Sequence, residues 1–319
     1  MIVVTGGAGF IGSNLVSGLN HRGRDDILVV DDLTDGTKFR NLVPCRIMDY
    51  WHLDDFYDAL EFGDGVTEKI DAVFHQGACS TTTEWDGHYM MDRNYTCSKL
   101  LLHYCLDNRI PFIYASSGSV YGTGTTFSED PVNEAPVNVY GYSKYLFDNY
   151  VRRVAPDPDS QVTGLRYFNV FGPNEQHKHG MASVAWHFNR QLLEIGKVRL
   201  FRGNDGYGDG EQRRDFIHVS DVVSVNLWLL EHPEISGIFN VGTGQSRSFN
   251  EVAQAIIDWH GKGEIKYIDF PDKLKGAYQS FTEADISRLR DAGYRDDFMS
   301  LESGIGQYLD WLNKPAAEN

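Results

Sequence analysis

A tyrosine–lysine pair near the middle of the sequence has a spacing that suits proton transfer. Tyr140 and Lys144 stand four residues apart, so a helix over this stretch would place both side chains on one face. A tyrosine hydroxyl, with a pKa of about 10, is a poor base at neutral pH, but a neighbouring ammonium group favours the phenolate. The pair predicts a catalytic Tyr140 with Lys144 as its electrostatic partner. The alternative is two ordinary side chains on an exposed helix face, because this spacing is common.

A serine could complete this group. Phe112–Ser116 is an apolar run that ends in hydroxyl residues, and Ser117 follows it directly. At the end of a buried strand, Ser117 could donate a hydrogen bond to the reacting oxygen beside Tyr140. The alternative is a serine that caps a turn or a helix.

A glycine-rich turn predicts a dinucleotide site near the start of the chain. The turn follows the apolar run Ile2–Thr5 and opens a helical stretch. Glycine lets the backbone turn sharply and lets a pyrophosphate approach it, while the helix N-terminus offers N–H groups to the phosphates. In this strand–turn–helix context a mere tight turn is the weaker interpretation. The predicted contacts are Gly6, Gly9, Phe10, Ile11 and Gly12.

Further residues are predicted to contact the rest of this cofactor. Asp31 and Asp32 end the second apolar run, where a carboxylate binds the ribose hydroxyls of NAD. Lys38 could instead pair with the 2′-phosphate of NADP, so the residues leave this choice open. Asp49 is a candidate for the adenine edge, and Lys144 for the cofactor ribose. The turn after the third apolar run is predicted to approach the cofactor again, and the alternative is an ordinary loop. Its residues are Gln76, Gly77, Ala78 and Cys79.

The elements that must position these residues alternate between strands and helices. Continuous apolar runs predict parallel strands that are buried on both faces, in an α/β, Rossmann-type doubly wound sheet. The predicted strands are Ile2–Thr5, Ile27–Asp31, Ala72–His75, Phe112–Ser116, Val162–Phe168 and Ile238–Val241. The predicted helices include Ile11–Leu19, Ser98–Leu106, Ser143–Arg153 and Phe249–Trp259.

The pattern changes after Phe168. Residues 169–214 read as irregular and polar with a Gly-rich surface loop, residues 216–243 as a return to the sheet, and Tyr267–Phe270 as extended. We therefore expect a dinucleotide-binding domain of residues 1–168 plus 215–244. A smaller C-terminal substrate-binding lobe would comprise residues 169–214 plus 245–319.

Composition excludes several classes of protein. With 41% hydrophobic and 23% charged residues the chain is an ordinary globular protein. A net charge of −16 argues against nucleic acid as a partner, since phosphate binding needs clustered Lys and Arg. The four cysteines form no C-x-x-C pair, and the histidines have no metal-ligand spacing, so we expect no metal, and core packing for most of the thiols. The short apolar start predicts neither export nor a membrane span, and hence a cytoplasmic protein.

The motifs together resemble the extended short-chain dehydrogenase/reductase family. The resemblance is carried by residues 5–12, Ser116-Ser117, Val120-Tyr121-Gly122, Tyr140 with Lys144, residues 166–173 and residues 214–219. It implies that Asn169 and Arg214 bind the diphosphate of a nucleotide sugar, a role that suits an amide donor and a guanidinium fork.

A narrower resemblance, to ADP-L-glycero-D-manno-heptose 6-epimerases, covers nearly the whole chain. It is carried by residues 83–87, 138–144, 177–178, 181–185 and 270–276. It implies NADP, with NAD as the alternative, an ADP-heptose that serves as a lipopolysaccharide-core precursor, and a homo-oligomer, specifically a pentamer. A hydride leaves C6 and returns to the other face, with Tyr140 and Lys178 as the two proton-handling groups. The implied contacts are Val170 and Lys178 to the cofactor, and Asn169, His187, Phe201, Arg202, Gly203, Asn204, Arg214 and Tyr278 to the substrate.

Some positions depart from this family's pattern. Asp32 replaces an Asn and Leu53 replaces a basic residue near the expected 2′-phosphate, which puts the preference for NADP in doubt. Arg93 replaces an Asn near the cofactor, Gly180 replaces a Ser near the substrate, and residues 206–211 lengthen a loop.

Three other functions are weighed. A 4,6-dehydratase would need an Asp-Glu pair where Gly118-Ser119 stand, so the sequence disfavours it. A UDP-sugar 4-epimerase shares the serine, tyrosine and lysine and stays open. A non-catalytic NAD(P)-binding regulator would not need Tyr140 or Lys144, so the presence of both residues disfavours this function without excluding it.

Overall fold

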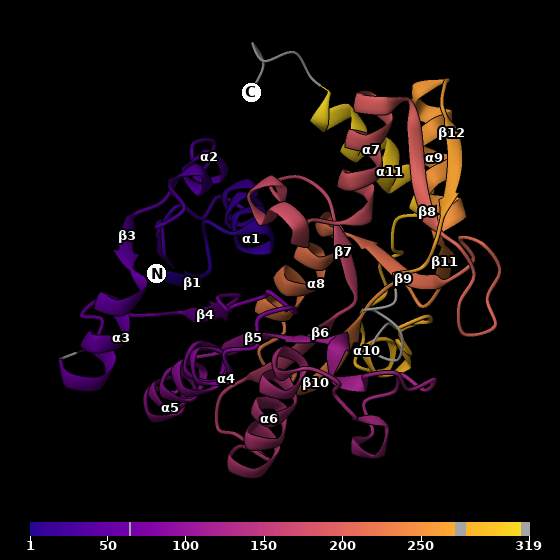
Figure 1. Cartoon of the computed structure of the whole chain (residues 1–319). Helices are drawn as coiled ribbons and strands as arrows, with labels where there is room; N and C mark the ends of the chain where they lie inside the picture. Colours follow the sequence, from indigo (N-terminus) through magenta and orange to yellow (C-terminus); the bar gives the residue numbers. More distant parts are fainter. Residues whose placement is uncertain (64, 272–278, 314–319) are drawn as a thin grey trace.

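A seven-stranded parallel sheet forms the centre of the molecule in the computed structural model, which describes residues 1–63, 65–271 and 279–313 (Figure 1). The spatial order is β10-β6-β5-β4-β1-β2-β3, and all neighbouring pairs are parallel. Most of these strands are apolar along their whole length, because helices cover both faces. Their bounds are β1 Ile2–Thr5, β2 Ile27–Asp31, β3 Asp49–His52, β4 Ala72–His75, β5 Phe112–Ser117, β6 Val162–Tyr167 and β10 Gly237–Val241.

Two hydrophobic clusters hold the helices to the sheet. One face packs against Leu15 of α1, Val222 of α8 and Leu289 of α10. The opposite face packs against Phe56 of α3, Leu101 of α5 and Phe147 of α6, and in Figure 1 α5 and α6 lie below the sheet and α1 and α8 above it. The helix bounds are α1 Phe10–His21, α2 Phe39–Leu42, α3 Leu53–Phe62, α4 Gly87–Met91, α5 Cys97–Asn108, α6 Val139–Val154, α8 Val219–Glu231 and α10 Ser287–Asp291.

The strand order reverses direction at β1, which lies between β4 and β2. From β1 the chain winds outward through β2 and β3, and then returns to β4 on the other side. At such a switch point the loops after adjacent strands diverge and leave a crevice at the carboxyl ends of the strands. The glycine turn after β1 and the Gln76–Cys79 turn after β4 both lie there.

A smaller lobe packs beside this domain, at the upper right in Figure 1. It contains a three-stranded sheet, β11-β9-β7, a two-stranded sheet, β12-β8, and a third hydrophobic cluster around Phe188, Ile256 and Tyr308. The bounds are β7 Asn169–Phe171, β8 Lys197–Phe201, β9 Arg213–His218, β11 Ser246–Ser248, β12 Glu264–Ile268, α7 Val184–Ile195, α9 Phe249–His260 and α11 Leu301–Leu312.

The doubly wound parallel sheet and its predicted strands are confirmed, to within a residue at the ends of β5, β6 and β10. The expectation of an irregular 169–214 is wrong, because α7 and β8 form there around Phe188 and Val198. Of residues 216–243 only β10 joins the main sheet, since β9 pairs with β7 and β11. The extended segment predicted at Tyr267–Phe270 lies earlier, in β12. The division into two domains stays a prediction.

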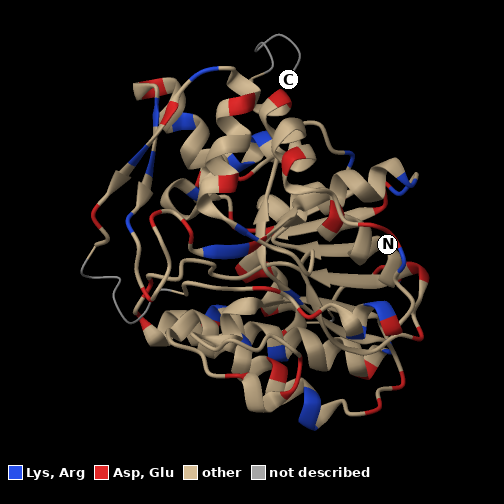
Figure 2. Cartoon of the chain, turned by 90° about the vertical axis from the view of Figure 1, so that its right-hand side faces the viewer, with Lys and Arg blue, Asp and Glu red and all other residues tan. Residues whose placement is uncertain are grey.

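Charge and the cysteines complete this description. Figure 2 shows acidic positions on helices and loops of both parts of the molecule, with basic positions interspersed. Cys105 is buried, and Cys45 and Cys97 pack against the two clusters beside the main sheet, while Cys79 and Cys97 both line the cavity described below. Within the described ranges, every helix is too short or too polar to cross a membrane.

Candidate active site

One cavity of about 890 Å³ opens at the carboxyl ends of the central strands and extends toward the smaller lobe. It is lined by the turns after β1 and β4, the ends of β2 and β5, and residues of α6, β7 and the segment before α7. Most of the predicted site residues meet here, although they are spread over more than half of the sequence. Those that line the cavity are Gly6, Gly9, Phe10, Ile11, Gly12, Asp31, Asp32, Lys38, Gln76, Gly77, Ala78, Cys79, Ser117, Tyr140, Lys144, Asn169, Val170 and Lys178.

The glycine turn has no room for side chains. Gly6 adopts φ +66°, and a Cβ there would lie 2.7 Å from the backbone of Gly77. A Cβ on Gly12 would lie 2.1 Å from the carbonyl oxygen of Gly6. Gly9 precedes the first residue of α1 and brings no side chain to cap it. A bare helix N-terminus beside a close-packed turn fits a dinucleotide diphosphate, which needs backbone N–H groups and close approach.

Acidic and basic groups share the end of the cavity beyond β2. Asp31 is buried, and its carboxylate accepts hydrogen bonds from Ala8 N at 2.8 Å and Lys38 Nζ at 2.7 Å. The pKa of Asp32 is lowered, chiefly by its hydrogen bonds with Thr34 and further by the charges of Lys38 and His52. This end of the cavity therefore has a carboxylate for ribose hydroxyls and cations within reach of a phosphate.

The two departures at this end also line the cavity. Leu53 begins α3 and contributes no charge, whereas Arg93 Nη1 pairs with Asp54 at 2.8 Å. A guanidinium therefore stands at this end of the cavity, on the segment that follows α4.

Tyr140 lies in the first turn of α6, close to Ser117 at the end of β5. Asn138 caps this helix by accepting a hydrogen bond from Gly141 N at 2.7 Å. Burial raises the pKa of the Tyr140 hydroxyl, and its hydrogen bond with Ser117 opposes that rise. A phenolate here therefore needs a compensating positive charge.

Lys144 supplies such a charge one turn further along α6. Its ammonium group is buried and donates to the carbonyl oxygen of Ala115 at 2.8 Å. Burial lowers the pKa of Lys144 to about 8, although the carboxylate of Asp148 acts in the opposite direction. The predicted Tyr140–Lys144 pair thus lies on one helix face, in the same cavity as the glycine turn.

Lys178 reaches the cavity from the segment Gln176–Met181, which belongs to neither sheet. Its ammonium lies 5.4 Å from the centre of the Phe10 ring, and burial lowers its pKa while the charge of Glu175 opposes this effect. Glu175 is fully buried and accepts from both the N–H and the hydroxyl of Ser183, so this segment is tied to the start of α7. The next residue, His179, adopts φ +48°. A desolvated lysine amine can act as a proton donor or acceptor.

The remaining predicted residues lie outside the lining of the cavity. The Asp49 carboxylate accepts from its own strand neighbour, Trp51 Nε1, at 3.0 Å. Arg214 is buried in β9 with its guanidinium over the Phe249 ring, and Phe249 itself lines the cavity. Tyr278 lies outside the described residues. His187 in α7, and Phe201, Arg202, Gly203 and Asn204 at the end of β8, belong to the smaller lobe, so their substrate contacts stay predictions.

Several lining residues were not predicted. Thr81 and Thr82 extend the turn after β4, Ser119 follows Ser117, and Phe216 faces the cavity from β9. The run of hydroxyl residues directly after Cys79 was the available signal for the first two. Among residues 1–63, 65–271 and 279–313, no group of three His, Cys, Asp or Glu side chains could hold a metal ion.

Comparison with known proteins agrees with this geometry. The chain is 61% identical over 310 residues to ADP-L-glycero-D-manno-heptose-6-epimerase of Alkalilimnicola ehrlichii, covering 97% of each protein. The crystal structure of the same enzyme from Helicobacter pylori superimposes with a TM-score of 0.83 at 32% identity, covering 98% of this chain and 96% of that one. UDP-glucose 4-epimerase of Thermus thermophilus in complex with NAD gives a TM-score of 0.80 at 26% identity, covering 98% and 99%. Residues 2–242 match the NAD dependent epimerase/dehydratase family, and the chain therefore belongs to that family.

Proposed function

We propose that the protein is an ADP-L-glycero-D-manno-heptose 6-epimerase, which inverts C6 of ADP-D-glycero-D-manno-heptose to the L-glycero form. The observation that carries the proposal is the shared cavity, in which Tyr140 from α6 and Lys178 from the segment Gln176–Met181 lie beside one glycine turn. Inversion exposes two faces of one carbon and so calls for two proton-handling groups. The choice of substrate is supported by the 61% identical relative of that name.

The residues around Tyr140 would act on the C6 hydroxyl. When bound, the nicotinamide supplies a hydride acceptor that later acts as a donor to the same carbon. Tyr140 takes the hydroxyl proton as the C6 ketone forms, and Ser117 holds the reacting oxygen by a hydrogen bond. The Lys144 ammonium, one turn further along α6, would favour the phenolate form of Tyr140 and bind the cofactor ribose.

Lys178 would serve the second face. After the C6 ketone rotates, its oxygen is presented to Lys178, which gives it a proton as the hydride returns. The direction of the shift supports this role, because burial lowers the pKa of Lys178 toward the working pH, where an amine exchanges protons most readily.

The smaller lobe would hold the nucleotide portion of the substrate. Asn169 lines the cavity and would bind the diphosphate, together with Arg214, whose guanidinium lies over the ring of the lining residue Phe249. His187, residues 201–204 and Tyr278 would surround the sugar and the adenosine.

For the cofactor we propose NADP. Lys38 lines the cavity beyond β2, and its ammonium could turn from Asp31 to a 2′-phosphate. His52 Nε2 lies 3.9 Å from the Asp32 carboxylate and would offset its charge when protonated. The resemblance of the sequence supports two further proposals, a cytoplasmic location and a homo-oligomer, specifically a pentamer, which sedimentation velocity would test.

The direct test offers the purified protein two substrates with NADP⁺ present. We expect ADP-D-glycero-D-manno-heptose to be converted to its C6 epimer and UDP-glucose to be left unchanged. Conversion of UDP-glucose to UDP-galactose in place of the heptose reaction would refute the proposal and favour a UDP-sugar 4-epimerase. The known similarity to a UDP-glucose 4-epimerase makes that comparison necessary.

A further inference from the structure

A buried ionic network lies directly behind the proton-transfer residues. Its centre is Asp148, which stands one turn beyond Lys144 in α6 and two turns beyond Tyr140. At this spacing the three side chains lie on one face of the helix. The helix face that enters the cavity with Tyr140 therefore continues into the protein interior as a carboxylate.

Asp148 ties this helix to the strand that carries Ser117. Its carboxylate is fully buried and accepts hydrogen bonds from the Tyr114 hydroxyl at 3.0 Å and the Ser116 hydroxyl at 2.9 Å. Between these two residues, the carbonyl oxygen of Ala115 accepts the hydrogen bond of Lys144. Three consecutive residues of β5 are thus hydrogen-bonded to α6, and the next residue, Ser117, is the one proposed to hold the reacting oxygen.

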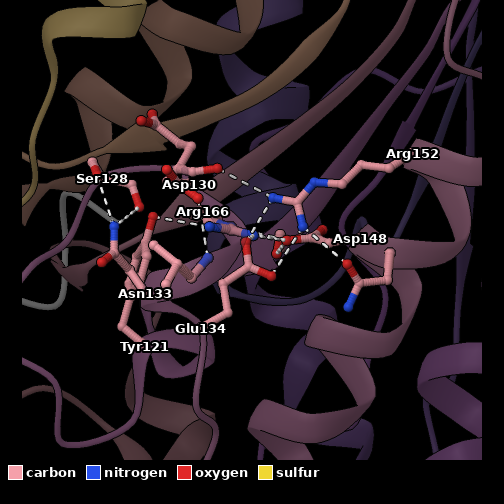
Figure 3. A network of polar contacts seen from close by, with 12 residues as sticks. Tyr121, Ser128, Asp130, Asn133, Glu134, Asp148, Arg152 and Arg166 are labelled. Carbon is pink, nitrogen blue, oxygen red and sulfur yellow. Dashed lines mark hydrogen bonds and ion pairs between the residues drawn. The ribbon is translucent and has the colours of Figure 1, made fainter.

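The charges in the network balance in pairs. Arg166, fully buried in β6, donates from Nε to Asp148 at 2.9 Å and from Nη2 to Glu134 at 2.5 Å (Figure 3). Arg152 also pairs with Glu134, at 2.6 Å. Two carboxylates and two guanidinium groups satisfy one another, and the loss of the Asp148 carboxylate would leave an excess positive charge in the interior on the side that faces Lys144.

Lys144 is the nearby group that would respond to this excess charge. Burial already lowers its pKa to about 8, and the charge of Asp148 is the main influence that favours its ammonium form. The other titratable groups that face Lys144 are the Cys79 thiol after β4, Tyr140 on its own helix, and His75 in β4. Burial holds the pKa of His75 at about 3, so this imidazole is neutral and provides no charge.

We propose that Asp148 is a positioning residue, which fixes α6 against β5 and keeps Lys144 protonated for its work beside Tyr140. Arg166 in turn holds the Asp148 carboxylate in place. This inference rests on the proposed function for the part that concerns catalysis, but the protonation of Lys144 can be measured by dinucleotide binding alone.

The test compares two neutralised carboxylates of the same network. D148N removes the charge that faces Lys144, whereas E134Q removes the other carboxylate partner of Arg166, which does not influence Lys144. For the wild-type protein and both variants, kcat and the Kd for NADP⁺ are measured between pH 6 and pH 9, with folding checked by circular dichroism. The binding curve reports Lys144 even in the absence of turnover.

For D148N we expect the basic limb of both profiles to move toward acid by about one pH unit or more. Activity at pH 8 relative to pH 6 would then fall by about fivefold compared with the wild type. E134Q should keep the wild-type limb, whatever its stability. The assignment would be overturned if the basic limb of the pH profiles stayed in place in D148N, or if it moved equally far in E134Q.

A second pair of variants covers loss of folding. If D148N is not recovered folded, D148E takes its place, because it retains the charge. Its pH profiles should keep the basic limb of the wild type, with a lower kcat. A basic limb that moves in D148E would count against the inference. S116A retains the carboxylate but loses one tie to β5, so kcat should fall with the limb unchanged, and an unaltered kcat would refute the positioning role. If the limb of the binding curve moves but no variant or wild-type protein epimerises ADP-heptose, the proposed function fails while the role of Asp148 stands.

Discussion

Substitution of Gly12 by alanine is the perturbation whose effect the glycine turn defines most clearly. The new Cβ would lie 2.1 Å from the carbonyl oxygen of Gly6, 2.7 Å from its carbonyl carbon and 2.9 Å from Gly7 Cα. A carbon atom and a carbonyl oxygen ordinarily approach no closer than about 3.3 Å. The turn must therefore open by about 1 Å, at the point where the cofactor diphosphate is proposed to bind.

Two losses should follow from this displacement. Overpacking of this kind lowers the free energy of unfolding by about 1–3 kcal/mol. The displaced turn also weakens its hydrogen bonds to a charged phosphate, and one such bond contributes about 1.5–3 kcal/mol, so the Kd for NADP⁺ should rise by about tenfold to a hundredfold. Fluorescence titration with NADP⁺ and urea unfolding measure the two effects separately.

Gly306 provides the matched control. It lies within α11, and a Cβ there would have no heavy atom within 4 Å, so G306A should bind NADP⁺ normally and gain about 0.5–1 kcal/mol of stability. A G12A protein that binds NADP⁺ as tightly as the wild type would refute the reasoning about the turn.

Three further predictions concern catalysis, cofactor choice and pH. Y140F should lower kcat by about a hundredfold to ten-thousandfold while NADP⁺ still binds. The control Y142F, on the exposed side of the same helix, should keep full activity. Equal activities of the two variants would show that Tyr140 takes no part in catalysis. K38Q should weaken NADP⁺ binding by more than about tenfold and NAD⁺ binding far less, and equal losses would contradict a 2′-phosphate contact at Lys38. Burial holds the pKa values of His75 and His218 at about 3 and 4 in the folded protein, below the unfolded value, so acid favours unfolding. Between pH 7 and pH 5 the protonation of each histidine in the unfolded chain should lower the free energy of unfolding by about 2 kcal/mol. Equal free energies from urea unfolding at the two pH values would exclude this effect.

The parts of the fold that could be predicted from the sequence are those with a strong local pattern. The strands β1, β2 and β4 are uninterrupted apolar runs, because a parallel sheet buries both of their faces. By contrast, β3 reads Asp-Tyr-Trp-His at the edge of the sheet, where one side of the strand is free of neighbours and the pattern is lost. The helix α7 and the strand β8 were not predicted, because they follow the polar segment Gln176–Met181 and only Gly196 separates one from the other.

The candidate site shows the same limit. The glycine turn, Ser117 and the Tyr140–Lys144 pair are local patterns with a physical reason, and they do meet in one cavity. The Asp148–Arg166 contact joins α6 to β6. No local sequence pattern predicts this contact, because an isolated Asp or Arg is usually a surface residue. Likewise, only the tertiary structure places the Arg214 guanidinium over the Phe249 ring, outside the lining of the cavity.

The central claim is that one hydride leaves C6 of the sugar and returns to the opposite face of the same carbon. It is tested most directly with ADP-D-glycero-D-manno-heptose deuterated at C6, which is epimerised in ordinary water and analysed by mass spectrometry and NMR. We predict that the product keeps the deuterium on C6, since the hydride never exchanges with solvent. A product that carries hydrogen from water at C6 would show carbanion chemistry and contradict the account.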